Sequence, residues 1–137
     1  MKLPSCLALL LLPICTGCMT SGVLPSTNLT NVQLAGENFQ VVATNVTGEA
    51  EAAYLIGFSG SVGQEITTFA LVRLEGNGML YREAIENLWA NFEAEHGEAG
   101  GRSLALVNLR YDADAWNILG VYTRPKISVR ADVVEFQ

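Results

Sequence analysis

The clearest pattern of hydrophobic and polar positions lies in residues 79–97, where apolar residues recur at spacings of three and four. That spacing places them on one face of a helix. The face comprises Tyr81, Ala84, Ile85, Leu88, Trp89 and Phe92. Asn77 is a suitable N-cap before this segment, and Gly97 is a suitable stop after it. The pattern predicts one amphipathic helix whose aromatic residues belong to the core rather than to a cofactor site.

The residues before this helix alternate between apolar and polar, as is typical of strands. Residues 38–58 predict one long bent strand, or two joined strands, ending near Phe58, with Gly48 at a bulge or bend. Glycines then recur at every third position from Gly57 to Gly63, which predicts a flexible loop rather than a phosphate-binding motif. Residues 69–78 predict a short strand or the approach to the helix.

The residues after the helix again read as strands. Residues 102–111 are apolar on both faces for much of their length, which predicts a central strand. Residues 112–117 contain two aspartates and an asparagine and predict a turn-like link. Residues 118–136 predict two strand segments with a break at Arg124–Pro125, since proline cannot donate a ladder hydrogen bond.

The order of elements predicts an α+β fold in which one amphipathic helix packs on a mostly antiparallel β-sheet, as a two-layer sandwich. A single helix covers only one face of such a sheet. Apolar residues on the other face would then need cover of their own. This pattern favours a homo-oligomer.

The first residues of the chain resemble the signal of a bacterial lipoprotein. Met1–Lys2 gives a positive start, and the apolar stretch Leu3–Ile14 is well short of the ~20 residues of a membrane-spanning helix. Thr16 and Gly17 then precede Cys18, the position of the lipidated cysteine in such signals. We therefore expect a signal peptide at residues 1–17 and lipidation of Cys18.

One position departs from that pattern, because Cys15 stands where lipoprotein signals usually carry leucine. The alternative is ordinary cleavage near Gly17 or Gly22, which would release a secreted soluble protein. With lipidation, Met19 rather than Asp after Cys18 indicates the outer membrane, with the domain facing the periplasm. Palmitate or a similar acyl chain would then hold the protein to the membrane.

Processing also decides how the Cys-x-x-Cys spacing of Cys15 and Cys18 is interpreted. Cleavage before Cys18 removes Cys6 and Cys15 and converts the remaining thiol to a thioether, so a redox or zinc centre is not expected. Residues 18–30 lack charge and predict a flexible tether, and residues 31–137 predict a single domain.

Charge narrows the classes of partner. The chain carries a formal net charge of −6, and loss of Lys2 with the signal peptide makes the remainder more acidic by one. An acidic domain repels nucleic acid, so we exclude nucleic acid as a partner.

Three segments carry a resemblance: "GEAEAAYLIGF", the helix, and "GRSLALVNLRY" with "ILGVYTRPKISVRADVVEF". They resemble a family of small, uncharacterised bacterial lipoproteins over nearly the whole mature chain. More distantly, the topology is similar to the YbjQ-like domains, long labelled heavy-metal-binding, in which ring-shaped oligomers are thought to form. The resemblance implies no catalytic or ligand residues, so none are assigned from it.

Chemistry-bearing residues are sparse. His96 is the only histidine, and with Glu93 and Glu95 it offers a loose divalent-metal site as an alternative to a solvated helix end. No nucleophile elbow of the Gly-x-Ser-x-Gly type is present. Trp116 is expected in the core, or alternatively on a contact surface. We predict a non-catalytic cell-envelope lipoprotein without a cofactor, whose partners are the membrane, copies of itself and another envelope protein. The alternative is a periplasmic divalent-metal-binding protein.

Overall fold

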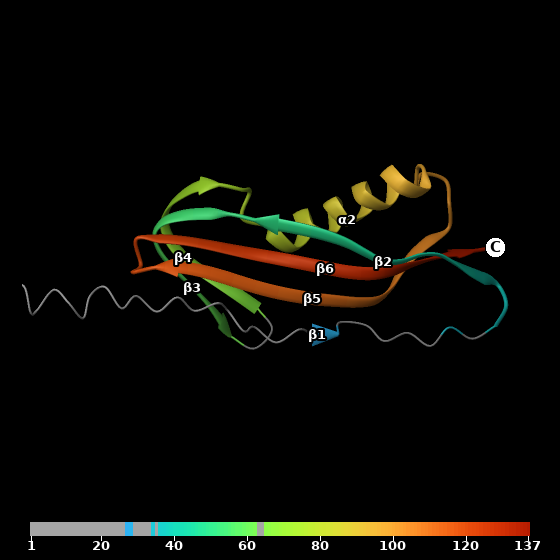
Figure 1. Cartoon of the computed structure of the whole chain (residues 1–137), viewed down its shortest axis with the longest axis horizontal. Coiled ribbons are helices and arrows are strands. Elements are labelled where there is room, and N and C mark those ends of the chain that lie inside the picture. Colours follow the sequence, from blue (N-terminus) through green and yellow to red (C-terminus); the bar gives the residue numbers. More distant parts are fainter. Residues whose placement is uncertain (1–26, 29–33, 35, 63–64) are drawn as a thin grey trace, which may run out of the picture.

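The computed structural model describes residues 27–28, 34, 36–62 and 65–137 (Figure 1). Its elements are β1 (Thr27–Asn28), β2 (Phe39–Glu51), β3 (Ala53–Val62), β4 (Glu65–Glu75), α2 (Leu80–His96), β5 (Leu104–Ile118) and β6 (Tyr122–Phe136). All strand pairs are antiparallel. The prediction of one helix on an antiparallel sheet is confirmed, although the helix covers only the part of the sheet around β2 and β6.

Strand β6 lies at the centre of the sheet. It pairs with β5 along one side, and with β2 and then β3 along the other. The β2 register runs from Phe39 opposite Phe136 to Glu51 opposite Lys126, and β3 continues with Tyr54 opposite Thr123. β2 and β3 are therefore two joined strands, as one of the two sequence interpretations proposed.

The loop predicted around the repeated glycines is wrong for the described residues there. β3 and β4 form a hairpin, with Phe58 opposite Phe69 and Ser59 opposite Thr68. Gly57 belongs to this ladder, opposite Ala70, and a Cβ on Gly57 would lie 2.6 Å from the Cβ of Ala70. Its glycine serves close approach of two strands rather than flexibility.

The link predicted at residues 112–117 is also wrong, since β5 continues without interruption to Ile118. The chain turns instead at Leu119 and Gly120, whose φ values are +48° and +70°. The Val121 N–H closes this turn by donating to the Ile118 carbonyl at 2.8 Å. Two central residues with positive φ suit the twist of a tight hairpin, so turn geometry ends the strand and the aspartates do not.

The break predicted at Arg124–Pro125 is absent, because β6 runs straight through it. In an antiparallel strand, the N–H and C=O of one residue point to the same side. The Pro125 carbonyl accepts from the Ala52 N–H at 3.1 Å, so the missing N–H of Pro125 also faces Ala52. Ala52 is the residue between β2 and β3, where the ladder changes partner. A central strand tolerates proline at this junction because the ladder is interrupted there anyway.

Helix α2 buries Leu80, Ala84, Leu88 and Phe92 against the sheet, where they meet Val129 and Val133 of β6 among others. The sequence predicts a bulge or bend at Gly48, but the register shifts of β2 lie between Val41 and Val46 instead. A Cβ at Gly48 would lie 2.0 Å from the Ala84 carbonyl oxygen. The glycine instead lets the helix backbone contact β2 directly.

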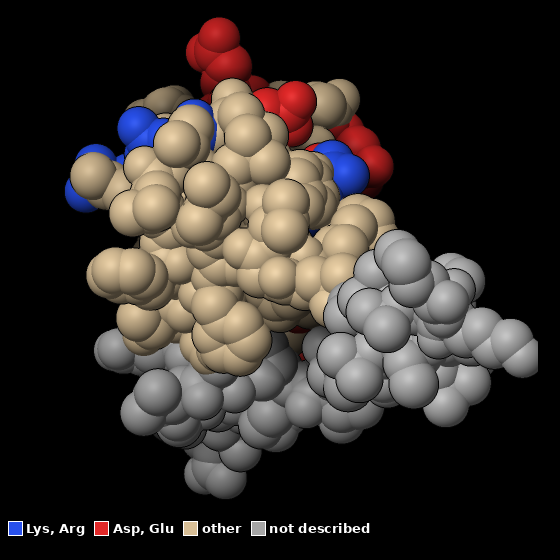
Figure 2. Space-filling model, turned by 90° about the vertical axis from the view of Figure 1, so that its left-hand side faces the viewer, with Lys and Arg blue, Asp and Glu red and all other residues tan. Residues whose placement is uncertain are grey.

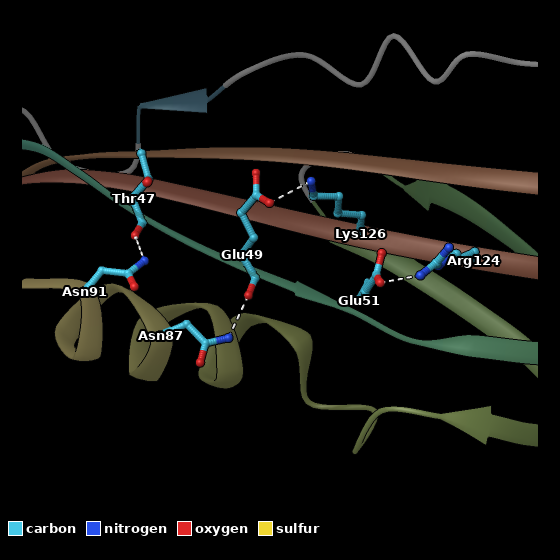
Figure 3. Close-up of polar contacts among 7 residues, drawn as sticks. All are labelled: Thr47, Glu49, Glu51, Asn87, Asn91, Arg124 and Lys126. Atoms are coloured by element: carbon cyan, nitrogen blue, oxygen red, sulfur yellow. Dashed lines mark hydrogen bonds and ion pairs between the residues drawn. The ribbon is translucent and has the colours of Figure 1, made fainter. Parts of the chain in front are cut away.

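Two helix asparagines attach α2 to the edge of β2 (Figure 3). Asn87 donates from Nδ2 to the Glu49 carbonyl at 2.7 Å, and Asn91 donates to the Thr47 carbonyl at 2.9 Å. These bonds satisfy backbone acceptors on a strand edge, a position that proteins usually protect.

The two predicted helix ends differ in outcome. The helix begins at Leu80 and its N-cap is Met79, without a side-chain cap; Asn77 instead accepts from the Met79 N–H at 2.7 Å. Gly97 ends the helix with φ +81°, as predicted. Tyr81, expected on the buried face, is 42% exposed.

Strands β2 and β5 each carry a register shift where they flank Asp132 of β6. Asn45 and Asn108 lie at these shifts with φ +57° and +54°. The Asp132 carboxylate accepts from the Asn45 N–H at 2.8 Å and from Asn108 Nδ2 at 2.9 Å. One carboxylate therefore holds both bulges, a common use of bulges to fix register.

Strand β1 lies inside the segment predicted as a free tether. Thr27 pairs with Tyr111 and Asn28 with Arg110. The described residues therefore join the end of that segment to the domain. The rest of it, the signal peptide and Cys18 lie outside the described residues.

Candidate functional site

The structure separates three surfaces that could carry function: the end of the helix at His96, the sheet face away from the helix, and the end formed by the β3–β4 hairpin. The proposed lipidation site, Cys18, lies outside the described residues. Within the described part of the chain, no helix is long and apolar enough to cross a membrane.

The three candidate metal ligands at the helix end do not converge. His96 Nε2 lies 3.9 Å from a Glu95 carboxylate oxygen, but Glu93 turns away and accepts from the Ala99 N–H at 3.0 Å. The His96 ring stacks on Phe92, with 5.1 Å between ring centroids. Among the residues that the structure describes, no three His, Cys, Asp or Glu side chains are grouped to hold a metal ion. His96 is thus placed mainly by ring packing.

Next to this helix end, an ion pair joins the loop after α2 to the last strand. Arg102 donates from Nε and one terminal nitrogen to the two carboxylate oxygens of Glu135, at 2.9 and 2.8 Å. These hydrogen bonds, and then the charge attraction, hold the pKa of Glu135 below its ordinary value and raise that of Arg102. The pair fixes one end of the domain rather than forming a reactive centre.

The sheet face away from the helix carries ion pairs as well as apolar side chains, since Trp116 is the direct cross-strand neighbour of Arg124 there. Lys126 Nζ lies 2.7 Å from a Glu49 carboxylate oxygen, and Arg124 pairs with Glu51 (Figure 3). On the far side of β6, Asp114 is the direct cross-strand neighbour of Lys126. A basic column on β6 therefore runs between acidic residues of β2 and β5. Such cross-strand pairs stabilise a solvated face.

A group of exposed apolar side chains lies at one end of the molecule. We call it the apolar end and define it by six exposed side chains: Ile56, Phe58, Phe69, Leu71, Leu119 and Val121. Phe69 is 78% exposed and Phe58 66%, and the two are direct cross-strand neighbours. Figure 2 looks onto this end and shows a broad surface of uncharged residues, with charged residues gathered toward its upper margin.

The apolar end joins the hairpin to the β5–β6 turn. The Ile56 N–H donates to the Val121 carbonyl at 2.8 Å, and the Gly57 N–H donates to the Gly120 carbonyl at 3.0 Å. No charged residue occurs in residues 53–60, 67–72 or 115–123, the described segments that build this end. Exposed apolar patches of this kind mark contacts with another protein or a membrane.

A cluster of polar side chains lies beneath the apolar end and holds it in shape. The Thr123 hydroxyl is fully buried, 3.0 Å from the Gly57 carbonyl and 2.5 Å from Asn117 Oδ1. Ser59 and Thr68 bond through their hydroxyls at 2.7 Å. Together these side chains tie β3 and β4 to the β5–β6 turn, so the apolar end is a built surface rather than a loose loop.

The expectation that Trp116 lies in the core is wrong, because its side chain is exposed. It is 44% exposed beside the apolar end, and its ring meets Tyr122 edge-on with 5.8 Å between centroids. The sequence pattern does not reveal the apolar end, because its repeated glycines predict a loop where β3 and β4 form a hairpin. The uncharged alternation between Glu65 and Arg73 was the signal that could have identified it.

No curated protein and no solved structure matches the chain. The comparisons thus give no support to the lipoprotein or YbjQ-like resemblance. A family model described as a family of unknown function, DUF6567, matches residues 1–137. The chain therefore belongs to this family.

Proposed function

We propose that this protein is a lipid-anchored cell-envelope protein that acts by contact rather than by catalysis. The observation that carries the proposal is the apolar end, because a rigid exposed surface of aromatic and aliphatic side chains is suited to binding. The N-terminal signal supports the anchor: a positive start, a short apolar run and small residues before Cys18. Met19 after Cys18 favours the outer membrane, facing the periplasm.

Metabolic labelling with a palmitate analogue tests the anchor in cells. We expect the protein to incorporate the label and to fractionate with membranes. Cys18→Ser should remove both properties, because no other cysteine follows residue 17. The matched control is Cys6→Ser, a cysteine within the same leader. Labelling that persists in Cys18→Ser would refute the proposal, whereas loss in both variants would indicate a damaged leader.

Self-association is a second part of the proposal, and the edge of β4 supports it. In the described part of the sheet, β4 pairs with β3 on one side only. An uncovered edge strand presents backbone donors and acceptors that a second copy can pair with. Val72, 47% exposed on this strand, lies outside the apolar end.

Sedimentation velocity of the unlipidated Cys18→Ser protein tests this association. We expect an oligomer that Val72→Lys converts to monomer, since an edge lysine opposes strand pairing. Thr47→Lys, on β2, provides a control charge on another exposed strand position. A monomer without any substitution would refute self-association.

A divalent-metal site at His96 has less support. Of the two candidate carboxylates, that of Glu95 comes near its ring, and that of Glu93 accepts from the backbone N–H of Ala99. Transition metals usually need more ligands than one imidazole and one carboxylate.

A further inference from the structure

We propose that the apolar end rests on the lipid bilayer, so that the protein lies against the membrane in one fixed orientation. This inference rests on the proposed anchor at Cys18 and goes beyond it. An anchor alone would hold the domain near the membrane without selecting a face. The apolar end is such a face, and the first residue of β1 is the one nearer to it.

The chemistry of the apolar end suits the boundary between headgroups and acyl chains. Its centre is a cross-strand pair of phenylalanines, with exposed aliphatic side chains around it. Trp116 and Tyr122 lie at its margin, and rings with one polar atom favour such boundaries. Residues 53–60, 67–72 and 115–123 contain no charged residue, so these segments bring no charge to the bilayer.

The direction of β1 leads the anchor toward this end. β1 runs antiparallel to β5, with Thr27 opposite Tyr111 and Asn28 opposite Arg110. Thr27, the first residue of β1, therefore lies nearer than Asn28 to Ile118 and the β5–β6 turn. That turn contributes Leu119 and Val121 to the apolar end.

The length of the intervening chain fits the same arrangement. Ile118 lies seven residues along β5 from Tyr111, which corresponds to about 23 Å in a strand. Cys18 lies nine residues before Thr27, a stretch that can span at most about 30 Å. The lipidated residue can thus reach the apolar end, but it can extend only slightly beyond it.

Charge favours a bilayer contact at this end over the other end. The chain is acidic, so anionic headgroups repel it overall. Glu93, Glu95 and Glu98 lie at the helix end remote from the hairpin (Figure 1). Contact through the apolar end keeps these carboxylates away from the headgroups. The anchor also raises the local concentration, so a modest apolar surface is sufficient.

Tryptophan quenching by brominated lipids can test this contact without relying on lipidation in cells. A chain that starts at Cys18 retains every described element and contains one thiol. That thiol can be coupled to a maleimide phospholipid in phosphatidylcholine vesicles. The probe variant combines Phe69→Trp with Trp89→Phe and Trp116→Phe. The control variant carries Trp116→Phe alone and keeps Trp89, which packs on Phe92 of the helix.

Acyl-chain-brominated phosphatidylcholine should quench most of the probe emission and shift it to shorter wavelength, while Trp89 stays unquenched. Adding Phe58→Ser to the probe variant should weaken the quenching, and adding Phe136→Ser, near the other end of β6, should not. Equal quenching of probe and control overturns the inference. The inference is also overturned if brominated lipid does not quench the probe and its emission shifts to shorter wavelength only at high protein density on the vesicle. That result would mean that a second copy of the protein covers the apolar end. If the probe is quenched but cells never label the protein with palmitate, the bilayer contact of the apolar end is supported and the lipid anchor is refuted.

Discussion

The side-chain amide of Asn117 bonds to both backbone groups of Ser59. Asn117 Oδ1 accepts from the Ser59 N–H at 3.2 Å, and its Nδ2 donates to the Ser59 carbonyl at 3.4 Å. The Asn117 side chain of β5 therefore supplies the two hydrogen bonds that a neighbouring strand would otherwise make to Ser59 of β3. Because Ser59 is buried, both backbone groups depend on this amide.

Asn117→Ala should lower the free energy of unfolding by about 1–3 kcal/mol, since it leaves buried backbone groups without a partner. Urea unfolding followed by circular dichroism gives this value. Asn38→Ala, at an exposed position, should change it by less than about 0.5 kcal/mol. A similar loss in both variants would show that the amide of Asn117 has no special role.

Gly48→Ala should be strongly destabilising, because the new methyl group would lie 2.0 Å from the Ala84 carbonyl and 2.4 Å from the Leu88 nitrogen. Both atoms belong to the helix backbone, so α2 must move away from β2. We expect a loss of about 3 kcal/mol. Gly100→Ala is the matched control, since no atom lies within 4 Å of its added Cβ. Equal melting temperatures for the two variants would contradict the close helix contact.

The Arg102–Glu135 pair should make stability depend on pH in acid. Hydrogen bonds from Arg102 lower the pKa of Glu135 in the folded protein below its ordinary value of 4.5. The unfolded state therefore binds this proton more readily than the folded state. The contribution is complete above the unfolded pKa and is lost as pH falls through the folded one.

Glu135→Gln should thus reduce stability at neutral pH and flatten the acid limb of a plot of melting temperature against pH. Glu98→Gln removes an exposed carboxylate in the loop after α2 and should leave the limb steep. An unchanged acid limb in Glu135→Gln would show that other carboxylates control acid unfolding.

Zinc should not stabilise the protein through His96. A ligand that binds the folded state raises the melting temperature, and the two groups at the helix end are too few for tight binding. Thermal unfolding with added Zn²⁺ should therefore match unfolding without it, in the unsubstituted protein and in His96→Ala. A rise in melting temperature that His96→Ala removes would instead establish the metal site.

The helix was predictable because apolar residues recur along it at helical spacing, and that spacing places them on one buried face. Leu80, Ala84, Leu88 and Phe92 are buried at helical spacing, and Gly97 stops the helix where the sequence indicated. The antiparallel strands followed from their alternation. Strand ends were less accessible, because they depend on partners remote in sequence.

Pro125 and Gly48 illustrate that dependence. The local preference of each residue predicts a break at Pro125 and a bend at Gly48. Each is explained by a neighbour: Ala52 at the strand junction, and Ala84 on the helix. The apolar end was hidden for the same reason, since Phe58 and Phe69 alternate as core residues do and only the sheet topology leaves them exposed.

The junction at Ala52 has a consequence for how the family can vary. No residue of the β2 ladder depends on the register of β3, because the two strands meet β6 on opposite sides of Pro125. Two residues can therefore be added to or removed from each arm of the β3–β4 hairpin without turning any β2 side chain to the wrong face. The core between α2, β2 and β6 is then unchanged while the β3–β4 hairpin becomes longer or shorter. Members of the family can therefore differ in hairpin length and share the same helix-covered sheet.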